Sequence, residues 1–137
     1  MIKSQKKYSR IAVKAIFRSG DKVLYYKTKK GVRDLPGGHL HFGETLITAL
    51  RRELKEEIGF QFELEPPLVY AWTYLSSDEE RHEAYIGYLF DLSETISFRS
   101  KEYGDKIEFI WLDKSEIKTE AFLSGMEKAL IKAAEYS

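Results

Sequence analysis

The sequence predicts an α+β fold in which helices pack on a mixed β-sheet. Segments with strand-like patterns outnumber helical ones, and the helices follow runs of strands, whereas a regular parallel α/β fold would alternate the two. The chain has 137 residues, of which 43% are hydrophobic, and this is enough for one core. We therefore expect residues 1–137 to form a single domain.

The first expected elements are the two strands of a hairpin. Residues 11–17 are rich in β-branched and apolar side chains, and residues 22–27 follow after a Ser-Gly-Asp turn signal. A charged loop is expected at residues 29–33. The Leu-Pro-Gly-Gly sequence at residues 35–38 should then break regular structure, because proline fixes φ and glycine permits positive φ.

The clearest helix is expected over residues 45–58. Leu46, Leu50 and Leu54 recur every four residues and form an apolar stripe along one side. Thr45 is suited to the N-cap, and Gly59 is suited to the left-handed residue that ends a helix.

The second half of the chain predicts further strands and one more helix. Strands are expected within residues 61–74, where two prolines interrupt them, and over residues 82–92 and 106–112. Residues 115–135 carry apolar side chains at helical spacing and predict an amphipathic helix.

Composition excludes several classes of protein. The 22 Lys and Arg residues balance the 22 Asp and Glu residues, whereas proteins that bind long nucleic acids usually carry a basic excess, so we expect no such partner. Without cysteine, the chain has no disulfide, thiolate zinc site or thiol nucleophile. Residues 1–10 are polar and basic, unlike a signal peptide, and no apolar run is long enough to span a membrane. The expected location is therefore the cytoplasm.

Three glutamates of the predicted helix indicate a metal site. Glu53, Glu56 and Glu57 are three and four residues apart, so they project from one side of the helix. Their like charges repel, and a bound hard cation would remove this repulsion. Mg²⁺ prefers oxygen ligands and bridges carboxylates to phosphates, whereas Ca²⁺ prefers more oxygens in a looser cage. The carbonyl oxygen of Gly38 could supply a further ligand.

Arg52 and Glu44 offer a way of fixing this site. Arg52 directly precedes the glutamates, and its guanidinium could form a fork with both carboxylate oxygens of Glu44. Such a fork would hold the loop before the helix against the helix itself.

Residues 38–60 resemble the Nudix box. Its pattern is Gly, five residues, Glu, seven residues, and then Arg-Glu-hydrophobic-any-Glu-Glu-any-Gly-hydrophobic. Leu54 fits the first hydrophobic position, while Phe60 departs mildly from the second, which is usually aliphatic. The fixed positions of the pattern are all matched, by Gly38, Glu44, Arg52, Glu53, Glu56, Glu57 and Gly59.

The resemblance implies an α/β/α sandwich and a Mg²⁺-dependent hydrolase, with Mn²⁺ as a substitute for the metal. Family members cleave a diphosphate linkage in a nucleoside diphosphate joined to another group. Glu44 and Arg52 would orient the site. The metal ligands that the box implies are Gly38, Glu53, Glu56 and Glu57.

The catalytic residues implied are Glu53, which would contact the attacking water, together with Glu57 and a glutamate outside the box. In many relatives such a glutamate comes from a loop late in the sheet and joins the metal site or acts as the base. Glu102 is the candidate here, with Asp105 and Glu108 as alternatives. A carboxylate would take the proton of the water while the metal neutralises the diphosphate.

The substrate remains open within the family. The short chain and the sequence around the box are similar to members that hydrolyse nucleoside triphosphates, including oxidised ones, to a nucleotide and pyrophosphate. Nucleotide sugars, dinucleoside polyphosphates and capped RNA ends are alternatives, as is either a monomer or a homodimer. A different class is a nucleotide-binding regulatory module without catalysis, although such modules usually lose box glutamates. Isoprenyl diphosphate isomerases of the same scaffold use a cysteine, which this chain lacks.

Overall fold

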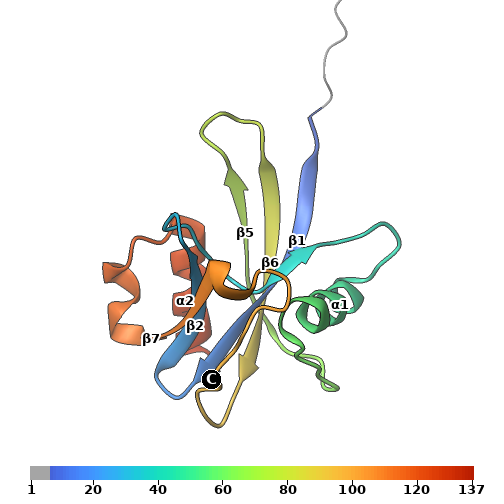
Figure 1. Ribbon diagram of the computed structural model, residues 1–137. Helices are drawn as coiled ribbons and strands as arrows, with labels where there is room; N and C mark the ends of the chain where they lie inside the picture. Colours follow the sequence, from blue (N-terminus) through green and yellow to red (C-terminus); the bar gives the residue numbers. More distant parts are fainter. Residues whose placement is uncertain (1–6) are drawn as a thin grey trace, which may run out of the picture.

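The computed structural model describes residues 7–137, so the first six residues of the basic N-terminal segment considered above lie outside the described part. Within residues 7–137, seven strands form one mixed sheet. Helix α1 (Leu46–Ile58) covers one face and helix α2 (Ser124–Glu135) covers the other (Figure 1). The predicted α+β fold, with the sheet between helices, is confirmed.

The centre of the sheet is strand β1 (Ser9–Ser19). It pairs in parallel with β6 (His82–Asp91), whose other edge carries the antiparallel strand β5 (Leu68–Leu75). Both faces of β1 are covered, because alternate side chains point to opposite faces: Phe17 packs in the cluster under α1 and Ile16 in the cluster under α2. This explains why residues 12–17 in the middle of β1 are all buried and are apolar except for Lys14.

The other half of the sheet surrounds strand β2 (Lys22–Thr28). This strand meets β1 near the hairpin turn and pairs with β7 (Ile107–Asp113) and β3 (Arg33–Asp34). Strand β4 (Gly37–His39) returns to β1 and pairs with residues 12–14. The expectation of irregular structure throughout residues 29–33 and 35–38 was therefore wrong at β3 and β4, because backbone pairing with β2 and β1 holds these residues extended.

Helix α1 begins and ends at the predicted residues. The Thr45 hydroxyl oxygen accepts a hydrogen bond from the Thr48 backbone N–H at 3.1 Å, and Gly59 ends the helix with a φ of 68°. Leu50 and Leu54 of its apolar stripe are fully buried against the sheet. The opposite side of the helix is left for polar residues.

Of the strands expected within residues 61–74, β5 forms after the two prolines, whereas residues 61–67 contain no strand. Packing between aromatic rings holds this segment against the sheet instead. The Phe60 ring meets the Phe17 ring edge-on at a centroid distance of 4.9 Å, and Phe62 meets Phe90 in the same way at 4.9 Å. An aromatic cluster therefore accommodates Phe60, the residue that departs from the aliphatic preference of the box.

The helix predicted over residues 115–135 is wrong in its middle. The chain forms a 3-10 helix at Lys114–Thr119, leaves helical structure at residues 120–123, and resumes it in α2. In the gap, the Phe122 ring packs edge-on against the Tyr25 ring at 4.9 Å. The apolar pattern does not reveal this interruption, because Phe122 within the gap packs against the core as a helical residue would.

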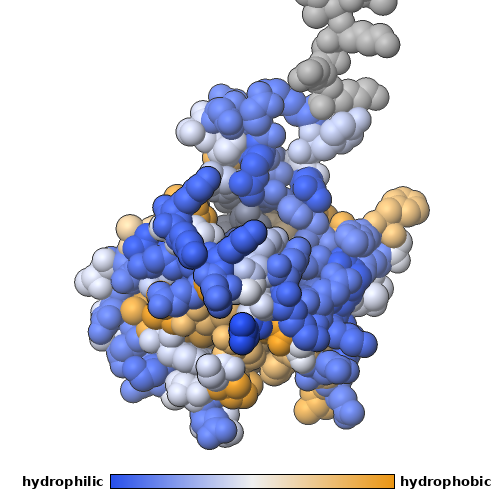
Figure 2. All heavy atoms as spheres, in the orientation of Figure 1, coloured by the Kyte–Doolittle hydropathy of each residue, from blue (hydrophilic) through white to orange (hydrophobic). Residues whose placement is uncertain are grey.

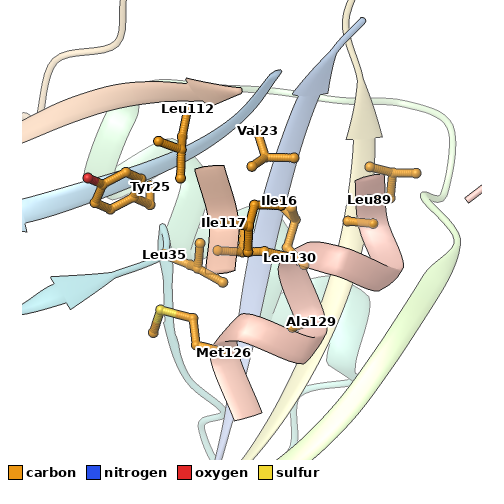
Figure 3. Packing of buried hydrophobic residues seen from close by; sticks show 11 residues of the cluster. Ile16, Val23, Tyr25, Leu35, Leu89, Leu112, Ile117, Met126, Ala129 and Leu130 are labelled. Atoms are coloured by element: carbon orange, nitrogen blue, oxygen red, sulfur yellow. The ribbon is translucent and has the colours of Figure 1, made fainter. Parts of the chain in front are cut away.

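The apolar pattern did identify the buried side of α2. Figure 3 shows Leu130 of this helix lying close to Ile16 of the sheet, and Ala129 and Leu89 belong to the same buried cluster. The outer surface seen in Figure 2 is mostly hydrophilic, with hydrophobic residues exposed in patches between. None of the helices in the described residues is long and apolar enough to cross a membrane.

Candidate active site

A polar cleft of about 330 Å³ brings together most of the predicted site residues. Strands β1 to β4, helix α1 and the segment before β7 all contribute to its wall. Gly38, Glu53, Glu57 and Glu102 line it, although Glu102 is distant from the others in the sequence. The Lys101 backbone N–H donates to the Glu57 carbonyl oxygen at 2.6 Å, and this bond fixes the neighbouring segment beside α1.

Glu57 is the most unusual of these carboxylates. It is only 3% exposed. The Gly37 backbone N–H donates to its Oε2 at 3.1 Å, whereas its buried Oε1 has no hydrogen-bond partner. Burial raises the pKa of Glu57 to about 7, although the Gly37 hydrogen bond and the positive charge of Lys14 act in the opposite direction. A buried oxygen without a partner is costly, and a cation ligated there would satisfy it.

This raised pKa predicts how the stability of the metal-free protein depends on pH. The pKa of Glu57 rises from 4.5 to about 7, so between these values the folded state binds more protons there than the unfolded state. The free energy of unfolding should therefore fall as pH rises through this range, by up to about 3 kcal/mol. The measurement is urea unfolding in EDTA at about pH 5 and about pH 8, compared between the wild type and Glu57→Gln. An equal pH dependence in both proteins would contradict the prediction.

Glu53 lies directly against the backbone of β4. A Cβ atom at Gly38 would meet the Glu53 carboxylate carbon at 2.3 Å, so glycine leaves the space that this side chain fills. Arg52 donates from Nη1 to Glu53 Oε1 at 2.7 Å. The two predicted ligands, the carbonyl-bearing Gly38 and the carboxylate of Glu53, are therefore neighbours in the cleft.

The Gly38→Ala substitution should weaken metal binding without unfolding the protein. The added methyl group would push the flexible end of Glu53 out of its place, and the position has no positive φ that would strain an alanine. Because displaced site residues typically cost 10- to 100-fold in metal affinity, we expect an increase of about that size in the Mg²⁺ concentration for half-maximal activity. Titrating Mg²⁺ checks this, with thermal unfolding as the control for folding. A variant with unchanged Mg²⁺ dependence would show that metal binding does not require Glu53 to occupy the space beside Gly38.

Arg52 joins the loop before α1 to the helix. Its Nε and Nη2 donate to the two carboxylate oxygens of Glu44 at 2.7 and 2.9 Å, which is the fork that the sequence suggests. This fork holds the pKa of Glu44 down to about 2. Nη2 also donates to the His39 carbonyl oxygen at 3.0 Å, so one guanidinium holds both the loop and the end of β4.

Glu56 is placed differently from the other two helix glutamates. Its side chain is 60% exposed and lies 3.4 Å from Arg52 Nη1. In the part of the chain that the structure describes, no three His, Asp or Glu side chains are already gathered closely enough to form a metal site. The donors nevertheless suit a hard cation, since they are carboxylate oxygens and one of them, Glu57 Oε1, is buried without a partner.

The structure adds cleft residues that sequence reasoning missed. Lys14 is only 7% exposed, and its Nζ lies 3.1 Å from Asp34 Oδ1 and donates to the Leu35 carbonyl at 3.3 Å. Tyr26 donates its hydroxyl to Asp34 Oδ2 at 3.3 Å. A lysine in the middle of an apolar strand was the signal that could have identified Lys14.

Glu83 of β6 is a second residue that was missed. It is 3% exposed, and both of its carboxylate oxygens lie within 3.1 Å of His39 Nε2. His39 is thus held by its side chain to β6 and by its carbonyl to Arg52 of α1. Nothing in the sequence pattern of β6 distinguishes Glu83 from the exposed charges around it.

An aromatic cleft of about 340 Å³ adjoins the polar cleft at Asp34, which lines both. Trp72, Tyr74 and Tyr85 form much of its wall, and the Trp72 and Tyr85 rings are 5.3 Å apart. A Cβ atom at Gly125 would meet the Trp72 ring at 2.3 Å, so the start of α2 approaches the strand closely. The aromatic side chains of β5 and β6 that line this cleft therefore lie next to the polar cleft that contains the carboxylates.

Comparison with known proteins agrees with this architecture. A family model described as the NUDIX domain matches residues 8–132. No curated protein sequence is significantly similar to the chain. The solved structures that resemble it include the MutT protein from Methanosarcina mazei Go1, with a TM-score of 0.74 and 21% identity over 93% of this chain and 94% of that one.

Two further structures are similar over nearly their full lengths. The MutT NUDIX hydrolase from Burkholderia pseudomallei has a TM-score of 0.71 and 20% identity, covering 96% of this chain and 100% of that chain. The E. coli dihydroneopterin triphosphate pyrophosphohydrolase has a TM-score of 0.73 and 15% identity, with the same coverage of 96% and 100%. At such identities the likeness shows a shared fold. Because the family model spans most of the chain and the box is complete, the chain belongs to the NUDIX domain family.

Proposed function

We propose that this chain hydrolyses a diphosphate linkage in a nucleoside diphosphate joined to another group, and that it requires Mg²⁺. The observation that carries the proposal is the buried Glu57, whose unpartnered Oε1 lies in one cleft with Gly38 and Glu53. A carboxylate in this position costs free energy unless a cation compensates it. Mn²⁺, which also accepts oxygen ligands, should substitute.

Each carboxylate has a distinct role in this proposal. Glu53, Glu56 and Glu57 would hold the metal together with the Gly38 carbonyl, and Arg52 and Glu44 would keep these ligands oriented. When bound, Mg²⁺ would neutralise the charge of the diphosphate and orient it for in-line attack. Glu53 orients the water. Glu102, which lines the cleft from the segment before β7, takes the proton of this water as the base.

We favour nucleoside triphosphates, including oxidised ones, as mononucleotide substrates, with a nucleotide and pyrophosphate as the products. The aromatic cleft supports this choice, since the rings of Trp72 and Tyr85 offer a surface on which a base can stack. Of the similar structures, one is named for a triphosphate substrate, dihydroneopterin triphosphate. Asp34, shared by both clefts, would then lie between the base and the phosphates.

A substrate panel tests the proposal. Nucleoside triphosphates, nucleotide sugars, dinucleoside polyphosphates and capped RNA ends would be incubated with Mg²⁺, Mn²⁺ or EDTA, and the products separated by chromatography. We expect a nucleotide and pyrophosphate to be released from at least one triphosphate, and EDTA to abolish the release. Tight nucleotide binding without turnover of any compound would contradict the proposal and identify a regulatory module instead.

A further inference from the structure

We propose that Glu83 of β6 is a positioning residue of the metal site and that it acts through the imidazole ring of His39. Glu83 lies outside the box and lines neither the polar cleft nor the aromatic cleft, so it does not itself reach a ligand. The inference rests on the proposed function, because it names the residue that keeps the Gly38 carbonyl and Glu53 in place for Mg²⁺.

Strand β4 depends on an anchor because it is short and rich in glycine. Two of its three residues, Gly37 and Gly38, have no side chain, and glycine loses more backbone freedom on ordering than any other residue. His39 is the one residue of this strand whose side chain can hold it in place. The carbonyl carbon of Gly38 is bonded to the nitrogen of His39, so a shift of His39 also turns the Gly38 carbonyl oxygen.

The His39 ring connects β4 to Glu83 across the central strand. His39 is paired with Ala12 of β1, and the other edge of β1 is paired with β6. Paired residues point to the same face of a sheet, and the small side chain of Ala12 leaves room there for the ring. The two oxygens of Glu83 lie 3.1 and 3.0 Å from His39 Nε2. A carboxylate only accepts hydrogen bonds, so Nε2 carries the hydrogen.

His39 is the main partner of this buried carboxylate. The other charged neighbour of Glu83 is Arg81, whose Nη2 lies 3.5 Å from Oε1 and whose side chain is 64% exposed. Ion pairs with such exposed side chains contribute little, because water screens them. Loss of the His39 ring therefore leaves a buried carboxylate with one weak partner, and such a group is costly.

His39 also connects Glu83 to the guanidinium that holds Glu53. The His39 carbonyl oxygen accepts from Arg52 Nη2 at 3.0 Å, and Arg52 Nη1 donates to Glu53 Oε1 at 2.7 Å. A displaced His39 thus affects two of the proposed ligands, the Gly38 carbonyl through the peptide bond and the Glu53 carboxylate through Arg52. Glu83 fixes both through a single ring.

The test measures direct binding of Mn²⁺ without substrate, from the electron paramagnetic resonance signal of the free ion. His39→Leu should raise the Kd for Mn²⁺ about tenfold or more. His39→Gln should stay within about threefold of the wild type, because its amide N–H can still donate to Glu83. His82→Leu is the matched control, since this exposed histidine precedes Glu83 on the opposite face of β6 and undergoes the same change.

A double variant separates positioning from stability. In His39→Leu/Glu83→Leu the buried polar pair becomes two apolar side chains, and such an exchange is often neutral or stabilising. We expect thermal unfolding at or above the wild-type temperature, while the Kd for Mn²⁺ remains raised about tenfold. A return of Mn²⁺ affinity together with stability would overturn the positioning role. If the double variant does not fold, the comparison of His39→Leu with His39→Gln decides.

The wild type tests the proposed function separately. If it binds Mn²⁺ and a folded His39→Leu protein binds equally well, the role of Glu83 is overturned and the proposed function stands. If the variants bind Mn²⁺ as weakly as expected but the wild type hydrolyses none of the substrate panel, the positioning role stands and the hydrolysis fails. A wild type that binds no Mn²⁺ overturns both.

Discussion

Replacing Glu57 with glutamine is expected to lower kcat by about 10³-fold or more while the protein remains folded. Glutamine has the same size, and its amide oxygen can still accept the Gly37 N–H. It carries no charge, however, and so could not compensate the cation that we propose to neutralise the diphosphate. Stabilisation by a metal is worth several kcal/mol at the transition state, and each 1.36 kcal/mol is a factor of ten in rate.

The measurement is the steady-state rate of the best substrate at saturating Mg²⁺, with thermal unfolding recorded in parallel. Glu135→Gln is the control, because this exposed glutamate of α2 undergoes the same chemical change far from the cleft. In EDTA, Glu57→Gln should be at least as stable as the wild type near pH 8, since it removes a buried charge. A variant that retains most of its activity would refute a role for Glu57 in holding the metal.

Replacing Arg52 with lysine is expected to raise the Mg²⁺ concentration for half-maximal activity by about 10- to 100-fold. The Arg52 guanidinium contacts both oxygens of Glu44, the carbonyl of His39 and the carboxylate of Glu53. A lysine ammonium is a compact point charge and cannot reproduce this planar arrangement. The loop before α1 and Glu53 would then lose their fixed positions.

Mg²⁺ titrations of the initial rate check this prediction. Arg51→Lys is the matched control, since the neighbouring Arg51 is exposed and contacts the Phe62 and Glu63 carbonyls away from the cleft. Because Arg52 acts through other residues, a change confined to the Mg²⁺ dependence supports a positioning role. The same loss in both variants would indicate that helix α1, not the site, had been damaged.

Much of the geometry of the candidate site could be predicted, because it depends on contacts between residues that are close in the sequence. Glu53 and Glu57 are four residues apart, so helical periodicity places them on the same side of the helix. The ends of the helix are specified by the capping residues themselves, Thr45 and Gly59. The Arg52–Glu44 fork joins residues of one loop and the helix that follows it. Such contacts can be anticipated from a sequence whenever the element that carries them is identified.

Other features depend on segments that are distant in the sequence. Glu102 reaches the cleft because the backbone of the preceding Lys101 is hydrogen bonded to α1. No local sequence pattern predicts this contact. Lys14 lines the cleft, and Glu83 contacts His39 of its wall, through the register of β1 with β4 and β6. The break before α2 likewise depends on the packing of Phe122 against a strand from the opposite end of the chain.

The glutamates of α1 show which features the sequence determines by itself and which only the tertiary structure decides. The order of residues was sufficient to place Glu53, Glu56 and Glu57 on one side of a helix, because helical geometry is the same in every protein. Only the packing of β4, β1 and the segment before β7 decided that Glu57 is buried with an unpartnered oxygen while Glu56 remains exposed. Burial is set by what covers each side chain, and the covering elements come from elsewhere in the chain.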